Sequence, residues 1–265
     1  YVSLDRTNHF LFVANYQGGN IAAWALRPDG SLGARTAFVQ HTGSSVNPQR
    51  QTKPYAHSIV TDPANRFVLV PDLGVDKMFV YRFDAATGAL TANNPPFVSV
   101  KPGSGPRHVV FHPNGRWVYL INEMGSIVIL YDWDAARGAL KEGQTVSTLP
   151  DGWKGVSTCS EMLIHPNGRF LYASNRGHDS IALFDIDAKT GRLKMVETVS
   201  SQGKTPRNFA FDPTGRWLLA TNHNSNNAVV FHIDEKTGRL KQTGQPVTVP
   251  YPFCERFLPV AQRGS

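Results

Sequence analysis

The chain has 265 residues and a formal net charge of +7, with 41% hydrophobic and 18% charged residues. This composition is typical of a globular protein with a sizeable core, and no apolar run in the sequence has the length of a membrane span. Lys and Arg are spread along the chain without a basic run, so we expect no nucleic-acid and no membrane partner, whereas a small anionic ligand would suit the charge.

A tight turn between two apolar segments recurs five times. An Asp or a His opens each turn, and an Asn or an Asp stands ten residues later. The opening residues are Asp5, Asp62, His112, His165 and Asp212, and the later residues are Asn15, Asp72, Asn122, Asn175 and Asn222. Successive units are therefore 57, 50, 53 and 47 residues apart. Spacings of this size, with several short strands per unit, predict an all-β fold of the β-propeller class, built from four-stranded antiparallel blades.

Each unit is predicted to contain four strands, as the third unit illustrates. A short strand over 108–111 leads into the turn His112-Pro113-Asn114-Gly115-Arg116, where Pro presets φ and Gly accepts the left-handed conformation. Apolar strands over 117–120 and 127–133 follow, and then a more polar strand over 144–149 that suits an outer edge. The matching second strands are predicted at 10–13, 67–70, 170–173 and 217–220.

These units predict one propeller domain over 1–265. Its repeats would span about 1–50, 51–102, 103–155, 156–203 and 204–250, with a first-strand segment over 251–265 that closes the ring. The chain opens in the middle of a repeat at Tyr1, so we expect at least one further blade upstream and a parent ring of more than five blades. Cys159 and Cys254 follow no metal spacing, and a disulfide between them stays open.

Two positions vary between the units while the scaffold repeats. Five residues before the turn residue stand His57, Arg107, Ser160 and Arg207, and eleven residues after it stand Tyr16, Leu73, Glu123, Arg176 and His223. In a blade the first strand pairs antiparallel with the second, so these positions meet at one rim of the channel. We expect a ligand site there. The alternative is a wet rim without chemistry, in which Arg107 pairs with Glu123 inside its own blade.

The remaining histidines carry less weight. His112 and His165 replace the turn Asp of other units, so we expect them to hydrogen-bond the turn backbone. His108 stands beside Arg107 and is a weaker candidate for the site. On an extended strand, His108 and His112 would lie roughly 13 Å apart, too far to share one ion. We therefore expect no metal and no cofactor, and the Gly-x-Ser-x-Gly elbow of serine hydrolases is absent from the sequence.

Several motifs resemble the lactonase family of seven-bladed β-propellers. They are Pro54-Tyr55-Ala56-His57, Gly105 to Pro113, Asn122-Glu123, Ser174 to Gly177, Thr205-Pro206-Arg207 and Val249 to Cys254. This resemblance implies a site with one His, one Glu and two or more Arg at the channel mouth. Matched residue by residue, the catalytic candidates are His57, Glu123, Arg107 and Arg176, with Arg207 as a further candidate that would bind the substrate. The other substrate-binding candidates are Asn122, His108, Tyr16 and His223, which lie at or beside the rim positions.

The resemblance implies hydrolysis of a sugar lactone, with 6-phosphogluconolactone as the leading candidate. Glu123 or His57 would be the general base, and Arg107 and Arg176 would bind the anionic group and the developing oxyanion. Two alternatives stay open: a lactonising or lactone-opening enzyme for another carboxylated substrate such as a muconolactone, and a non-catalytic propeller that binds a ligand at its rim. The partner would be a small anionic lactone. Both intracellular and exported members occur in the family, with the cytoplasm slightly favoured here, and the oligomeric state is unknown.

Overall fold

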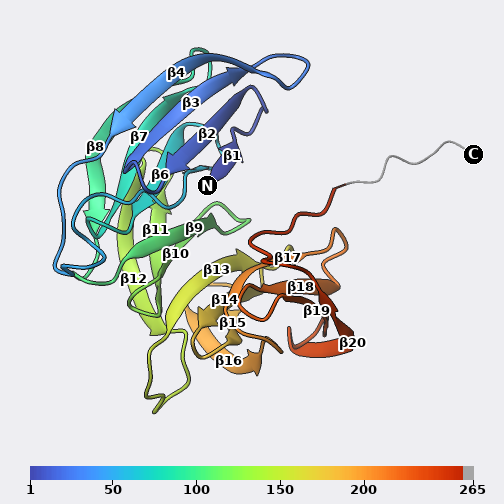
Figure 1. The fold of residues 1–265 in the computed structure, drawn as a ribbon. Coiled ribbons are helices and arrows are strands. Elements are labelled where there is room, and N and C mark those ends of the chain that lie inside the picture. The colour runs from blue at the N-terminus through green and yellow to red at the C-terminus, as the bar shows by residue number, and fades with distance from the viewer. Residues whose placement is uncertain (259–265) are drawn as a thin grey trace, which may run out of the picture. The chain divides into compact units, whose positions relative to one another are not determined.

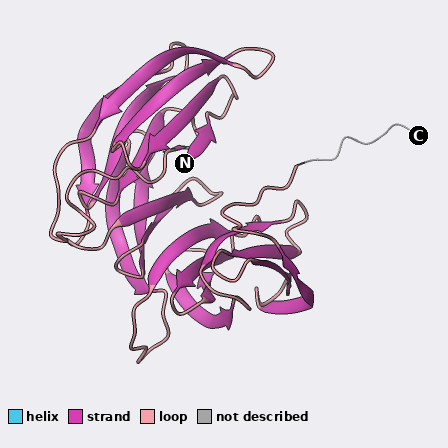
Figure 2. Ribbon diagram, in the orientation of Figure 1, coloured by secondary structure: helices cyan, strands magenta, loops and turns pink. Residues whose placement is uncertain are grey.

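The structure is a computed structural model that describes residues 1–258. Throughout these residues the chain forms only strands and loops (Figures 1 and 2). Twenty strands form five four-stranded sheets, and within each sheet every strand pairs antiparallel with its neighbour in sequence. Each sheet is thus an up-and-down meander, which is the blade predicted from the repeats.

The first three sheets occupy the N-terminal part of the chain. The first contains β1 (Val2–Leu4), β2 (Phe10–Asn15), β3 (Asn20–Leu26) and β4 (Leu32–Gln40). The second contains β5 (Val60–Thr61), β6 (Phe67–Asp72), β7 (Lys77–Asp84) and β8 (Ala89–Ser99). The third contains β9 (Pro106–Phe111), β10 (Trp117–Asn122), β11 (Ile127–Asp134) and β12 (Ala139–Ser147).

Two further sheets follow. The fourth contains β13 (Thr158–Ile164), β14 (Phe170–Arg176), β15 (Ser180–Ile186) and β16 (Leu193–Ser200). The fifth contains β17 (Pro206–Phe211), β18 (Trp217–Asn222), β19 (Asn227–Ile233) and β20 (Leu240–Thr248). The described part of the chain divides after Ser147 into two compact units. The prediction of one domain over 1–265 stays a prediction.

The repeated turn explains why the strands begin where they do. The Asp62 carboxylate Oδ1 accepts hydrogen bonds from the backbone N–H groups of Arg66 and Phe67, at 2.6 and 2.8 Å. Its Oδ2 accepts the backbone N–H of Ala64 at 3.3 Å, and in the third and fourth sheets Nδ1 of His112 and of His165 accepts the matching N–H two residues later, at 3.1 and 3.2 Å. The predicted turn role of these two histidines is therefore confirmed.

The cores lie between neighbouring sheets of each unit. In the first unit, one cluster joins the first and second sheets around Phe12, and another joins the second and third sheets around Leu69 and Tyr131. In the second unit, a cluster around Tyr172 and Phe231 joins the fourth and fifth sheets. Burial of these alternating apolar side chains holds the hairpins in register.

The segment that follows β20 differs from its prediction. Residues 251–258 form no strand, because their backbone donors bind side chains instead: Tyr251 N–H donates to Asn226 Oδ1 at 2.9 Å, and Glu255 N–H to Asn208 Oδ1 at 3.1 Å. The rest of the predicted closing segment, 259–265, lies outside the described residues. Both cysteines are free thiols, Cys159 buried and Cys254 exposed, which answers the question of a disulfide.

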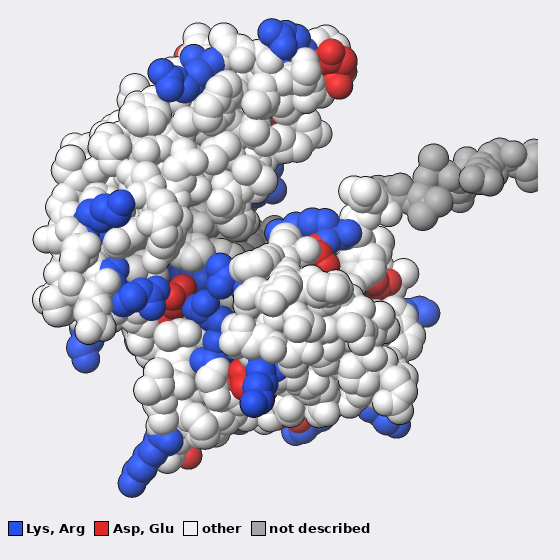
Figure 3. Space-filling view, in the orientation of Figure 1, with Lys and Arg blue, Asp and Glu red and all other residues white. Residues whose placement is uncertain are grey.

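The surface agrees with the dispersed charge of the sequence. On the face shown in Figure 3, Lys and Arg form several separate groups, some with acidic side chains beside them, rather than one continuous stripe. No helix in the part of the chain that the structure describes has the length and apolar character needed to cross a bilayer.

Candidate active site

The hairpin of β9 and β10 brings two predicted site residues together. Its pairing shifts register between Ile121 and Asn122, so Arg107 is an extra residue in a β-bulge. A bulge re-aims the side chain of its extra residue. Glu123 directly follows β10, and its carboxylate Oε2 lies 3.1 Å from Nε of Arg107. The ion pair inside this blade, which was the alternative to a ligand site at the rim, is therefore present.

Three nitrogen-bearing side chains surround the Glu123 carboxylate. Arg107 Nε and His57 Nε2 approach Oε2, at 3.1 and 3.7 Å, and Arg50 Nη2 approaches Oε1 at 2.6 Å. The side chains of Arg107 and Glu123 are 4% and 6% exposed, so their attraction is weakly screened. The backbone N–H of Glu123 donates to the Gly105 carbonyl at 2.7 Å. The carboxylate is thus fixed from its backbone and from its side chain.

His57 enters this cluster from the segment before β5. Its backbone N–H donates to the Pro71 carbonyl at 2.9 Å, and its ring meets the rings of Tyr16 and His108 edge-on, with centroids 5.1 and 5.2 Å away. Burial lowers the pKa of His57 well below its ordinary value, and the charge of Arg107 and the His108 ring act in the same direction. The imidazole is therefore neutral around pH 7, and the same shift makes it a weaker base than an ordinary histidine.

Arg50 is a member of the cluster that the repeat pattern did not reveal. It lies in the irregular segment between β4 and β5, and its side chain is 42% exposed. Burial acts against its charge, but hydrogen bonds to Glu123 and Tyr16 outweigh that effect and raise the pKa of the guanidinium. The only sequence signal for Arg50 is the unusual length of this loop, which carries no repeat position.

The other predicted residues of the first unit have distinct places. The Tyr16 ring packs in a tilted arrangement against Tyr55, with centroids 4.7 Å apart, and meets His57 edge-on, so it borders the cluster. Nη1 of Arg107 lies 3.1 Å from Nε2 of His108, so this histidine contacts the Arg107 guanidinium. Asn122 is fully buried, and its amide Nδ2 donates to the Leu120 carbonyl of its own strand at 3.3 Å.

Three predicted residues belong to the second unit. Arg176 donates from Nη2 to the Cys159 carbonyl at 2.8 Å. The guanidinium of Arg207 lies over the Phe253 ring, 5.0 Å from its centroid, and the His223 ring lies 4.3 Å from the same ring. Arg207 and His223 therefore share an aromatic partner, whereas Arg176 is anchored on its own sheet.

A second group of acidic side chains in this unit was not predicted. Glu161 on β13 accepts a hydrogen bond from the Asn208 amide, and Glu255 Oε2 accepts one from the Thr221 hydroxyl at 2.8 Å. Burial raises the pKa of Glu255 to about 7, the nearby Glu161 adds to the rise, and the Thr221 hydrogen bond opposes it. Glu161 directly follows the rim residue Ser160. A charged residue in an inner strand is the sequence feature that could have identified it.

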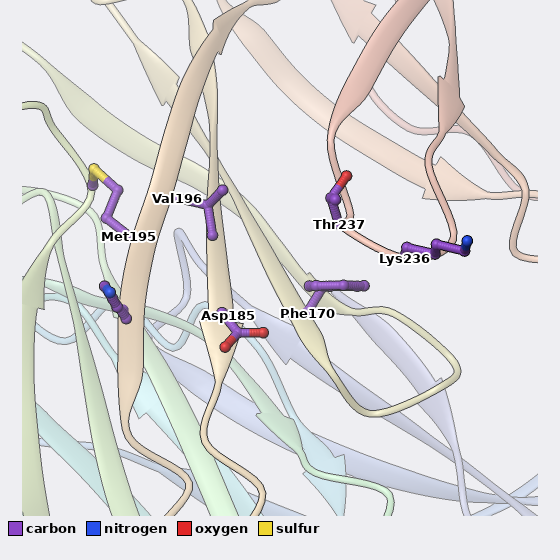
Figure 4. A pocket seen from close by; sticks show the side chains of 7 residues that line it. Phe170, Asp185, Met195, Val196, Lys236 and Thr237 are labelled. Atoms are coloured by element: carbon purple, nitrogen blue, oxygen red, sulfur yellow. The ribbon is translucent and has the colours of Figure 1, made fainter.

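The second unit also has a surface pocket of about 370 Å³ (Figure 4). It lies between the fourth sheet and the turn that joins β19 to β20. Its lining residues are Phe170, Asp185, Lys194, Met195, Val196, Lys236 and Thr237. None of the predicted site residues belongs to this lining.

The Glu123 cluster combines the groups that ester hydrolysis requires. A neutral imidazole and a carboxylate can accept a proton from water, and guanidinium groups can stabilise negative charge that develops on oxygen. Among residues 1–258, no group of three or more His, Cys, Asp or Glu side chains could hold a metal ion. Acid–base and electrostatic chemistry is what these side chains can supply.

Nearly the whole chain is similar to known proteins of one family. The family model described as lactonase, seven-bladed β-propeller, matches residues 1–257. A 6-phosphogluconolactonase of Bacillus subtilis is 39% identical over 258 residues, which are 97% of this chain and 72% of that protein. Other curated relatives are covered over 60% of their length.

Solved structures agree with the family model. A Lactobacillus plantarum protein superimposes with a TM-score of 0.92 at 32% identity, over 98% of this chain and 74% of that one. The periplasmic gluconolactonase of Pseudomonas aeruginosa gives a TM-score of 0.89 at 38% identity, over 95% of this chain and 70% of that one. The predicted fold class is confirmed, and the chain belongs to the lactonase family of seven-bladed β-propellers.

Proposed function

We propose that this protein hydrolyses a sugar lactone, and that 6-phosphogluconolactone, opened to 6-phosphogluconate, is its substrate. The observation that carries the proposal is the Glu123 carboxylate held between Arg50, Arg107 and His57. Family membership supports the reaction class, and the 6-phosphogluconolactonase of Bacillus subtilis, at 39% identity, supports the phosphorylated sugar.

In the proposed reaction, a water oxygen attacks the lactone carbonyl carbon. The proton that leaves the water passes to the Glu123–His57 pair, and guanidinium groups stabilise the oxyanion on the former carbonyl oxygen. The bond between this carbon and the ring oxygen then breaks, and the ring oxygen takes the proton to become a hydroxyl group. The single product is an open-chain sugar acid, and the second hydrogen of the water is released to solvent when its new carboxyl group ionises to a carboxylate.

Each side chain has a proposed role. His57 is neutral and can accept the proton, and Glu123 lies where its charge would stabilise the resulting imidazolium. Arg107, almost fully buried, orients Glu123. Arg176 stays a catalytic candidate on the resemblance, and Arg207, Asn122, His108, Tyr16 and His223 stay substrate-binding candidates on the resemblance or on their predicted place at the rim.

The test is turnover of a panel of lactones against their spontaneous opening. We expect the protein to accelerate opening of 6-phosphogluconolactone, and His57→Asn to lower kcat by about 10²-fold or more. Faster opening of a muconolactone than of the sugar lactones would favour the alternative substrate class. Binding of lactones without turnover of any of them would contradict the enzymatic function.

A further inference from the structure

The two arginines that bind Glu123 differ in how much of each is accessible. The Arg107 side chain is 4% exposed, whereas the Arg50 side chain is 42% exposed. A guanidinium has five N–H donors in a planar fork, and Nη2 of Arg50 reaches Glu123 Oε1. A substrate group that approaches Glu123 from solvent can therefore contact Arg50 much more readily than Arg107.

The loop that carries Arg50 is held in place by hydrogen bonds. The Arg50 backbone N–H donates to Asn47 Oδ1 at 3.0 Å, and the Gln51 N–H donates to the Asn47 carbonyl at 2.9 Å. Next to it, the buried Gln51 amide donates to the Leu73 carbonyl at 2.8 Å. The backbone on both sides of Arg50 is thus fixed, which lowers the entropy that this loop loses when Arg50 binds a ligand.

Asp76 joins this loop to the hairpin of Arg107. Its carboxylate Oδ2 accepts hydrogen bonds from the Ser45 hydroxyl and the Gln51 amide, at 2.6 and 2.7 Å. The same carboxylate accepts the backbone N–H groups of Gly103 and Gly105, each at 2.7 Å. Asp76 is 4% exposed and has a φ of 52°. One buried carboxylate therefore sets the position of Arg50 relative to Arg107 and Glu123.

From this geometry we propose that Arg50 is a specificity-determining residue that binds the anionic group of the substrate and selects phosphorylated lactones over neutral ones. This inference rests on the proposed lactonase function. A guanidinium binds phosphate with two parallel N–H···O bonds, and such charge-assisted bonds are about twice as strong as neutral ones. Arg107 keeps the buried task of orienting Glu123.

A competing role for Arg50 is to neutralise Glu123 and nothing more. In that case its loss would impair every lactone equally, because the reaction centre is common to all of them. A substrate-binding role predicts an unequal loss that depends on the phosphate. The two roles are therefore separable by comparing two substrates that differ only in that group.

The experiment compares Arg50→Gln, Arg50→Lys and the control Arg116→Gln, an exposed arginine of the same unit. We expect Arg50→Gln to lower kcat/KM for 6-phosphogluconolactone by about 10- to 100-fold, mainly through KM, and to change kcat/KM for glucono-δ-lactone less than about threefold. Arg50→Lys should retain part of the preference, and Arg116→Gln all of it. Equal losses on both substrates, or no loss, would overturn the inference.

Binding of the reaction products tests the role of Arg50 independently of turnover. We expect Arg50→Gln to weaken binding of 6-phosphogluconate about tenfold and binding of gluconate little, as measured by calorimetry. If the unsubstituted protein opens no lactone, the proposed function fails, while this binding difference still decides the role of Arg50. Unchanged 6-phosphogluconate binding in Arg50→Gln would refute that role even if lactones are hydrolysed.

Discussion

Two carboxylates, the buried Glu123 in the first unit and the half-buried Glu255 in the second, lie in different electrostatic surroundings. Glu123 is held by two guanidinium groups and an imidazole. Glu255 has the Thr221 hydroxyl as a hydrogen-bond donor, and burial and the neighbouring Glu161 raise its pKa to about 7. The same chemical group is therefore stabilised as an anion in one place and favoured in its protonated form in the other.

The same blade architecture can therefore carry sites of different chemistry. Arg107 and Arg207 both stand at a β-bulge where the first strand of a blade pairs with the second. Arg107 meets Glu123, whereas Arg207 lies over Phe253. The backbone presents the same position in both blades, and the partner side chain decides whether it can serve chemistry.

Removing Glu123 should have the largest effect on stability. Glu123→Ala would take a carboxylate away from the almost fully buried Arg107, and breaking a buried ion pair by removing one partner costs about 3–5 kcal/mol. Urea denaturation at pH 7 would measure the loss. A loss below about 1 kcal/mol would mean that the pair is effectively solvated.

Removing Asp76 should destabilise the protein by an amount comparable to the loss of Glu123. Asp76→Ala deprives the backbone donors of Gly103 and Gly105 of their acceptor, and each buried donor left without one costs about 1–3 kcal/mol. We also expect KM for 6-phosphogluconolactone to rise, because the Arg50 loop loses its anchor. Asp76→Asn keeps an acceptor oxygen, so its KM should lie between those of Asp76→Ala and the unsubstituted protein. An unchanged KM in a destabilised Asp76→Ala protein would show that Asp76 supports the fold without positioning Arg50.

Replacing Glu255 should stabilise the protein at alkaline pH, whereas replacing Glu123 should destabilise it. Its folded pKa of about 7 lies above the ordinary 4.5, so the native chain holds a proton that the unfolded chain releases between those values. The free energy of unfolding should therefore fall as pH rises from about 4.5 to about 7. Glu255→Gln should remove this slope and stabilise the protein at pH 8 by on the order of 1 kcal/mol. Urea denaturation of both proteins at pH 5 and pH 8 would measure this. A variant less stable than the unsubstituted protein at pH 8 would contradict the prediction.

Arg207 should matter least for stability. Arg207→Ala removes a cation–π contact with Phe253, a contact that contributes about 0.5–1 kcal/mol at partly exposed sites. Thermal unfolding monitored by circular dichroism would measure it, with Arg207→Lys as the variant that keeps a cation. A loss as large as that of Glu123→Ala would remove the contrast between the two blades.

Much of the fold was predictable because its signals are local. Pro and Gly punctuate the turns, and the apolar runs between them, such as 117–120 and 170–173, lie inside strands β10 and β14. The exception is 251–258, whose sequence repeats a first-strand pattern although its backbone binds the side chains of Asn208 and Asn226. A strand also needs a neighbouring edge, and the pattern of one segment does not encode that.

The site was predictable only where it follows the repeat. His57, Arg107 and Glu123 stand at positions that vary against a constant scaffold, and the structure brings these three together. Arg50 and Asp76 lie in loops without a repeat position, and their roles depend on contacts 73 and 29 residues away along the chain. The bulge at Arg107 is likewise a property of strand pairing, which residue types alone do not specify.

The most direct measurement is the rate of 6-phosphogluconolactone hydrolysis by Glu123→Gln and Glu255→Gln, each corrected for spontaneous opening. Both variants replace a carboxylate, buried at Glu123 and half-buried at Glu255, with an amide of the same shape. The account predicts that kcat of Glu123→Gln falls by about 10²-fold or more, whereas Glu255→Gln keeps the activity of the unsubstituted protein. A folded Glu123→Gln protein with an unchanged rate would contradict the assignment of the Glu123 cluster as the active site.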